Sequence, residues 1–127
     1  MTLPVTSLLA GSFALLMVPL SLQVSMRRAK LGVSAGDAND DTLRRRIRAH
    51  GNFIEYAPIA LIVVGLIELD GTAKPLVVGL AVAFFLSRAL HAIGMLYTST
   101  PTLRAGGMLI QHVAFLVAGV WLVLKVI

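Results

Sequence analysis

Apolar residues fill four long segments of the chain, and polar residues separate them. The segments span about residues 3–25, 42–69, 74–97 and 102–126. As α-helices with a rise of about 1.5 Å per residue, segments of this length cross the roughly 30 Å hydrocarbon core of a bilayer. One long polar loop, LGVSAGDANDD, and two short turns connect them. Because short turns make consecutive helices antiparallel, the pattern predicts an all-α, up-and-down four-helix bundle forming one membrane domain over residues 1–127.

Local signals agree with these helix boundaries. The stretch DDTLRRR offers Asp and Thr as N-cap residues of the second helix, and Pro75 stands in the first turn of the third. Pro58 lies inside the second helix, where a membrane bundle tolerates a kink. The first segment begins MTLPVTS, without the basic start of a signal peptide, and no A-x-A-like site precedes MRRAK. We therefore expect this segment to be retained as a transmembrane helix.

Composition supports a membrane protein and excludes several chemistries. Hydrophobic residues make up 57% of the chain, charged residues only 13%, and the mean hydropathy is +0.88. The absence of cysteine excludes disulfides, thiolate metal ligands and a cysteine nucleophile. Although the net charge is +5, no nucleic-acid motif or interleaved aromatic pattern accompanies it, so we do not expect nucleic-acid binding.

The basic residues are distributed unevenly between the two ends of the predicted bundle. Eight of the eleven Lys and Arg residues gather around the long first loop and the third loop: Arg27, Arg28, Lys30, Arg44, Arg45, Arg46, Arg48 and Arg104. Lys74 and Lys125 fall at the opposite end, and Arg88 falls within the membrane. The positive-inside rule therefore predicts a cytoplasmic first loop with both termini outside, as in a bacterial inner-membrane protein.

The stretch RAHGNFIEYAP, residues 48–58, carries polar side chains into an apolar helix. Arg48, Asn52, Glu55 and Tyr56 stand at i, i+4, i+7 and i+8, so they share one helix face. A charge at mid-bilayer costs about 2.5–3.5 kcal/mol even on the insertion scale, so such a face turns toward a bundle interior or a cavity. It indicates either a polar cleft for an anionic or zwitterionic ligand or structural ion pairs, for example between Glu55 and Arg88.

The other predicted helices carry matching polar edges near the same end. These edges comprise Gln23 and Arg27 on the first helix, Arg88, His91 and Met95 on the third, and Arg104, Met108 and Gln111 on the fourth. His91 and His112 can also serve simply as hydrogen-bonding groups between helices. The three histidines fall on different helices without an H-x-x-x-H spacing, so no metal site is expected.

Two stretches of the chain resemble the MAPEG family, the membrane-associated proteins in eicosanoid and glutathione metabolism. They are SLQVSMRRAK at 21–30 and LRRRIRAHGNFIEYAP at 43–58. The family pattern R-A-x-x-N-x-x-E-Y is complete here, and SRALHAIGMLYTSTPTLR extends the likeness to the junction of the third and fourth helices.

The resemblance implies a homotrimer that binds glutathione as co-substrate between neighbouring subunits near the cytoplasmic face. One subunit would supply Arg48, Asn52, Glu55 and Tyr56, and the adjacent one Arg27, His50 and Arg104. Arg104, at the start of the fourth helix, matches the catalytic arginine of the family. His91 and Met95 stand where the family often has aromatic residues, and His91 is retained as a candidate glutathione contact.

Three functions remain open at this point. The first is a glutathione-dependent transferase or peroxidase acting on a lipophilic electrophile or hydroperoxide that arrives from the membrane lipid. The second is a non-catalytic MAPEG-type protein that binds lipid or a partner. A small four-helix exporter is the third, but the first helix lacks the carboxylate that such transporters place there.

Overall fold

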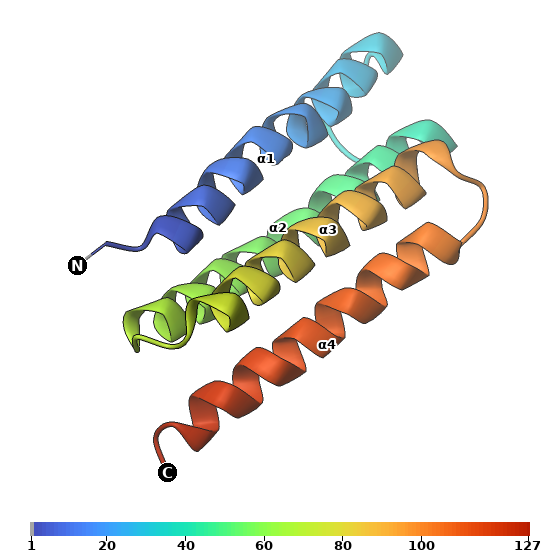
Figure 1. Cartoon of the computed structure of the whole chain (residues 1–127). Coiled ribbons are helices and arrows are strands. Elements are labelled where there is room, and N and C mark those ends of the chain that lie inside the picture. The colour runs from blue at the N-terminus through green and yellow to red at the C-terminus, as the bar shows by residue number, and fades with distance from the viewer. Residues whose placement is uncertain (1) are drawn as a thin grey trace.

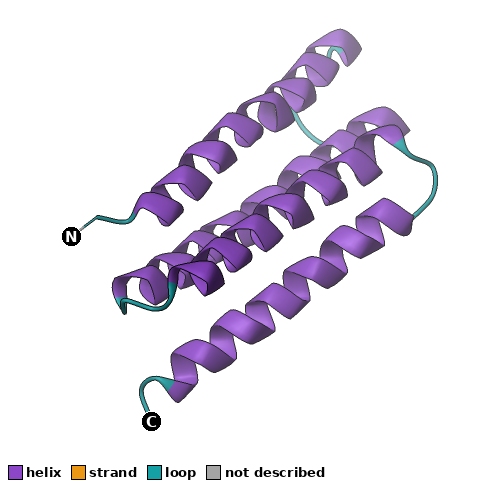
Figure 2. Cartoon of the chain, in the orientation of Figure 1, coloured by secondary structure: helices purple, strands orange, loops and turns teal. Residues whose placement is uncertain are grey.

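The chain folds into four long α-helices (Figure 2). The computed structural model describes residues 2–127, in the order α1 (Pro4–Leu31), α2 (Asp41–Leu69), α3 (Lys74–Tyr97) and α4 (Thr102–Leu124). Over these residues no strand forms. Each helix is long and apolar enough to cross a membrane. The all-helical membrane class predicted from the sequence is therefore confirmed.

The main departure from the predicted boundaries is at the end of the first helix, which continues past residue 25 to Leu31. The basic segment MRRAK prolongs the helix because Arg, Lys and Ala are good helix formers once the apolar run has ended. Gly32 then stops it in the left-handed conformation, with φ of 68°. The N–H groups of Gly32 and Val33 bond back to the carbonyls of Ala29 and Arg28, which are terminal acceptors of the helix.

The helices run up and down, but the bundle is open on one side. In Figure 1, α2 and α3 lie side by side, with α1 against one side of the pair and α4 against the other. Helices α1 and α4 make no contact within the described residues. Both termini and the α2–α3 turn lie at one end, and the other two loops lie at the opposite end. The α1–α2 and α3–α4 loops are thus placed together, at the end where the basic residues gather.

Packing between the helices relies on small residues and a few aromatic rings. Ala49, Ala57 and Ala60 of α2 are buried, which allows close approach of the neighbouring backbones. The rings of Phe13 and Phe53 meet edge to face with centroids 5.4 Å apart, tying α1 to α2. Most large aliphatic side chains on the outer faces of α1 and α4 are instead exposed, as expected for a surface in contact with lipid.

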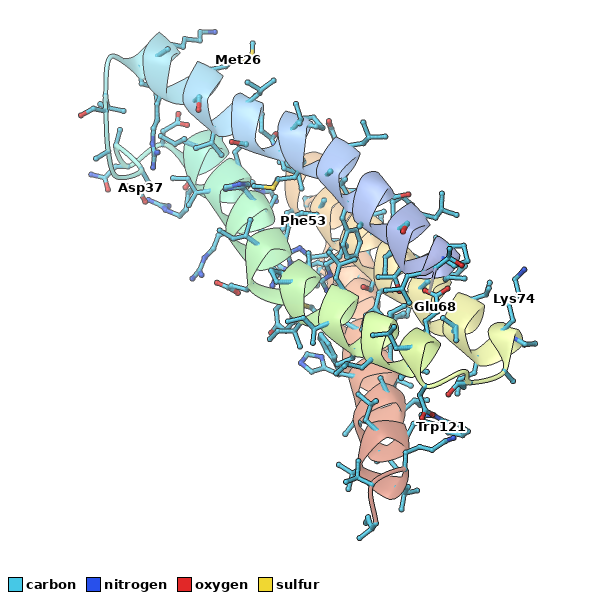
Figure 3. All side chains as sticks on the ribbon, turned by 90° about the vertical axis from the view of Figure 1, so that its left-hand side faces the viewer. Met26, Asp37, Phe53, Glu68, Lys74 and Trp121 are labelled. Carbon is cyan, nitrogen blue, oxygen red and sulfur yellow. The ribbon has the colours of Figure 1, made fainter. Side chains whose placement is uncertain are left out.

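A carboxylate from α2 caps the N-terminus of α1 (Figure 3). No side chain of α1 itself caps this end. The Glu68 carboxylate accepts hydrogen bonds from the backbone N–H groups of Val5 (2.9 Å) and Thr6 (2.8 Å) and from the Thr6 hydroxyl (2.6 Å). A negative charge at this position also interacts favourably with the helix dipole. The start of α1 is thereby fixed against the end of α2.

A second carboxylate fixes the other end of α1. Asp40 is the N-cap of α2, where it accepts from the N–H of Leu43 at 2.6 Å, and it also binds Arg27 of α1 through two bonds of 3.1 and 2.6 Å. The hydrogen bond from Arg27, with a smaller contribution from the Leu43 N–H, lowers the pKa of Asp40 to about 2. Arg46 adds a bond of 2.9 Å to the carbonyl of Gln23.

We expect Glu68→Ala to destabilise the protein by about 1–3 kcal/mol, because it removes the acceptor of two N–H groups at the start of α1. Glu68→Gln retains an amide oxygen as acceptor, so its loss of stability should be clearly smaller. Thermal unfolding of both variants in detergent checks this order. Equal losses for the two variants would contradict a capping role for the carboxylate oxygens.

The stabilising effect of Asp40 should depend on pH. Its folded-state pKa of about 2 lies below its usual value of 3.8, so its contribution is complete above about pH 4 and disappears as the pH falls through about 2. Asp40→Asn keeps the cap on Leu43 but removes the charge. The stability difference between the wild type and this variant should therefore narrow from pH 4 to pH 2 in unfolding experiments. A difference that stays constant over this range would count against the ion pair with Arg27.

Candidate functional site

A polar cavity of about 410 Å³ lies between α2, α3 and the start of α4. Its walls are formed by Ile47, Arg48, Gly51, Asn52, Glu55, His91, Met95 and Arg104. Five of the residues predicted from the sequence thus meet in one chain: Arg48, Asn52, Glu55, His91 and Arg104. The side chains of Arg48, Glu55 and Arg104 remain exposed, so this cavity holds two cations and one anion that a ligand can reach.

Arg104 reaches the cavity because α4 begins very close to α3. A Cβ atom at Gly94 would lie 2.6 Å from the backbone nitrogen of Arg104, so only glycine permits this approach. The Arg104 guanidinium then lies 3.5 Å from the sulfur of Met95. The resemblance implies that Arg104 acts at the site of a neighbouring subunit; within its own chain, Arg104 lines the same cavity as Arg48 and Glu55.

The same helix pair is equally close one turn further along. A Cβ atom at Gly107 would lie 2.7 Å from the carbonyl oxygen of Ser87 and 2.9 Å from the nitrogen of His91. Beside this contact the Ser87 hydroxyl donates to Gln111 at 2.6 Å, with both side chains fully buried. The position of α4, and with it that of Arg104, therefore depends on two glycine contacts.

Arg88 supports the cavity from inside the bundle. It is 2% exposed, and its guanidinium donates to the side-chain oxygen and to the backbone carbonyl (3.4 Å) of Asn52. It also lies 5.0 Å from the ring centroid of Tyr56, and one nitrogen is 3.8 Å from the sulfur of Met108. Arg88 therefore holds Asn52 and Tyr56 in place by hydrogen bonding and a cation–π interaction rather than by a salt bridge.

The ion pair between Glu55 and Arg88, considered as a structural role for both residues, is not formed. Glu55 makes no salt bridge to any residue in the described range 2–127. The guanidinium of Arg88 instead contacts Asn52 and the ring of Tyr56, so it is not available to Glu55. The Glu55 carboxylate is exposed at the cavity instead.

Three predicted residues do not line this cavity. Arg27 is bound to Asp40. Tyr56 packs over Arg88, with its ring centroid 6.3 Å from His112 and 6.2 Å from Phe115. His50 lies off the polar face of α2, and its buried Nε2 has no hydrogen-bond partner among the described residues.

The sequence pattern does not show how Arg88 acts or how close α3 and α4 come together. An arginine in the middle of an apolar helix, directly after Ser87, was the available signal for a buried polar network. Gly94 and Gly107 carried no signal of their own, because only the approach of a second backbone distinguishes them from other glycines. In the described part of the chain, no group of three metal-binding side chains comes together.

The fold and cavity define a small four-helix integral membrane protein with a charged cavity in the half of the bundle where the basic residues gather. Within that class, the chain belongs to the MAPEG family, whose model matches residues 6–124.

Two curated relatives also match the chain, and both are inner membrane proteins. The chain is 32% identical to the inner membrane protein YecN of Escherichia coli strain K12 over 90 residues, which cover 71% of this chain and 69% of YecN. The YecN of Escherichia coli O6:H1 matches to the same extent. No solved structure matches the chain.

The two neighbouring glycines at the start of α4 provide a matched test of the helix contact. Gly107→Ala should destabilise the protein by about 1–3 kcal/mol, because the added methyl group displaces α4 from Ser87 and His91. Gly106→Ala meets no atom within 4 Å, so it should be neutral or stabilise the helix by up to about 1 kcal/mol. Unfolding experiments in detergent measure the stability of both variants. Equal changes in stability at the two positions would argue against the close contact between α3 and α4.

Proposed function

We propose that this protein is a glutathione-dependent membrane transferase or peroxidase that stabilises the glutathione thiolate with Arg104. The observation that carries this proposal is the cavity in which Arg48, Glu55 and Arg104 are exposed without a salt bridge to one another. Membership of the MAPEG family supports the choice of glutathione.

The charges of the cavity complement those of glutathione. The tripeptide carries two carboxylates, one ammonium group and one thiol. A guanidinium binds a carboxylate through two parallel hydrogen bonds, and a carboxylate binds an ammonium group. We assign a glutathione carboxylate to Arg48, the ammonium group to Glu55 and the sulfur to Arg104. Asn52 and His91 line the same cavity and can donate or accept further hydrogen bonds.

A single guanidinium is sufficient for thiol activation. A free cysteine thiol has a pKa of about 8.5, so only a few per cent is ionised at neutral pH. Lowering that pKa by two units requires about 2.7 kcal/mol. A positive charge about 4 Å away provides on the order of 4 kcal/mol at an effective dielectric constant of 20, before desolvation is deducted. The protein therefore needs no separate base to form the thiolate.

The thioether of Met95 does not prevent this role for Arg104. The sulfur lies 3.5 Å from a guanidinium nitrogen, and a thioether is only a weak hydrogen-bond acceptor. A thiolate at the same place would bind the guanidinium far more strongly because it carries a full negative charge.

We further propose a homotrimer, in which a neighbouring protomer completes each glutathione site. In their own chain Arg27 and His50 lie outside the cavity, so they can contribute only across a protomer boundary. The surface between protomers would bring Arg27 toward the tripeptide while its pair with Asp40 keeps the guanidinium oriented. Tyr56 would act indirectly through Arg88.

The distribution of basic residues supports an orientation with the first loop in the cytoplasm and both termini outside. The name of the YecN relative supports the inner membrane as the location. A cavity at this depth is reached by glutathione from the cytoplasm and by a lipophilic electrophile or hydroperoxide from the bilayer.

A non-catalytic role in binding lipid or a partner is the second candidate. The observation that favours it is the pair His91 and Met95, which line the cavity at positions where the family often has aromatic residues. Such a protein would keep the fold and the cavity without activating a thiol.

Arg104→Ala should abolish the thiolate signal of bound glutathione while leaving binding largely intact. At pH 7 a two-unit rise in the thiol pKa lowers the ionised fraction about 25-fold, and turnover should fall at least as much. Ultraviolet absorbance of the thiolate, measured on the purified protein with glutathione, checks this directly.

Two comparisons separate the possible outcomes. Glu55→Gln keeps the size of the side chain but removes the charge, so it should weaken glutathione binding while the bound fraction still shows a thiolate. Unchanged turnover in Arg104→Ala would move the catalytic assignment elsewhere. Glutathione binding without any thiolate signal in the wild type would favour the non-catalytic role.

A further inference from the structure

A second hollow, separate from the cavity just described, runs along the seam between α1 and α3. Its inner part has a volume of about 240 Å³ and is mainly apolar, with walls that include Leu16, Pro19 and Leu20 of α1 and Ala89, Ala92 and Ile93 of α3. The facing side chains of Pro19, Ala89 and Ala92 are small, so the two helices leave a space between them. We refer to this inner part as the seam groove.

The seam groove opens into a polar mouth at the end where the basic residues gather. The mouth has a volume of about 160 Å³ and is lined by Gln23, Thr42, Arg45, Arg46, Leu96 and Tyr97. Gln23, Leu96 and Tyr97 line both parts, so the groove and the mouth are continuous. An apolar channel thus ends beneath two guanidinium groups.

The two arginines at the mouth are held in position but keep their charge available. Arg45 donates to the carbonyl of Thr98 at 2.9 Å, and Arg46 donates to the carbonyl of Gln23 at 2.9 Å. Neither forms a salt bridge with a described residue, unlike Arg44, which is paired with Asp37 and Asp41. Carbonyl acceptors orient a guanidinium without neutralising it, so the mouth keeps two positive charges.

Tyr97 indicates the depth of the mouth in the bilayer. It is 79% exposed and lines both the mouth and the groove. Tyrosine is enriched at the level of the lipid headgroups, where its ring is in contact with apolar matter and its hydroxyl with water. The mouth therefore lies at headgroup level, with the groove extending toward the membrane interior.

From this arrangement we infer that the seam groove is a binding site for an anionic phospholipid of the surrounding bilayer. One acyl chain would lie along Leu16, Leu20 and Ile93, and the phosphate would be bound by Arg45 and Arg46. The match of an apolar channel with a doubly basic mouth is what selects this occupant, because basic recesses between membrane helices bind anionic headgroups. The site is independent of the proposed glutathione cavity, with which it shares no lining residue.

The test compares phosphatidylglycerol with phosphatidylcholine of the same acyl chains, added to the full chain in neutral detergent and followed by native mass spectrometry. The wild type should prefer phosphatidylglycerol by about 25-fold, or fivefold for each arginine. The double variant Arg45→Gln/Arg46→Gln should lose this preference. The matched control Arg44→Gln removes the same kind of charge next to the site and should change the preference less than twofold.

A second variant tests the groove without touching the arginines. Ala89→Phe fills the groove, so it should weaken the binding of both lipids while the preference for phosphatidylglycerol persists. Because Arg45 and Arg46 also bond to backbone carbonyls, circular dichroism verifies the helical content of the double variant, and Ala89→Phe remains decisive if that variant unfolds.

Several results would overturn the inference. One is the absence of any preference for phosphatidylglycerol in the wild type, and another is an equal loss in Arg44→Gln, which would indicate only diffuse charge attraction. Displacement of the lipid by millimolar inorganic phosphate would indicate a site for a free anion. A change of oligomeric state in Ala89→Phe with unaltered lipid binding would assign the groove to contact between copies of the chain.

Discussion

A buried guanidinium without a carboxylate partner organises the centre of this protein. Arg88 is 2% exposed, and its guanidinium donates to Asn52, to the Ser87 hydroxyl and to the Met108 sulfur. Its cationic face also meets the ring of Tyr56. Inside a bilayer an unpaired charge is costly, so these contacts fix α2 against α3 strongly. They also decide the chemistry of the cavity. Because Arg88 is satisfied without Glu55, that carboxylate stays exposed beside Arg48 and Arg104 and is available to a ligand.

The ends of α1 show a related use of charge. Glu68 and Asp40 each receive backbone N–H groups at the start of a helix, and both also join α1 to α2. The seam between α1 and α3 is left hollow by comparison. Helix α1 is therefore attached along one side only, which leaves its other side open to lipid or to a neighbouring protomer.

The fold was largely predictable from the sequence, because long apolar runs with short connections leave few alternatives in a membrane. The end of α1 was not predictable, because a charged segment can either form a loop or continue the helix. The helix ends where Gly32 takes a left-handed conformation. The polar face of α2 was predictable because helical periodicity fixes it. The pairing of Arg27 with Asp40 was not predictable. It depends on the path of the α1–α2 loop, in which Ala38 and Asn39 have positive φ. Likewise, periodicity suggested that Glu55 and Arg88 could meet between neighbouring helices. It could not show that the Arg88 guanidinium contacts Asn52 and Tyr56 instead.

The proposed function requires that the exposed charges of Arg48, Glu55 and Arg104 together form a receptor for one glutathione molecule. A crystal or cryo-electron microscopy structure of the protein with glutathione tests it most directly. We expect the tripeptide in the cavity, with its ammonium group at Glu55 and its sulfur at Arg104. A structure in which Glu55 is paired with an arginine of a neighbouring protomer, leaving no space for the tripeptide, would contradict it.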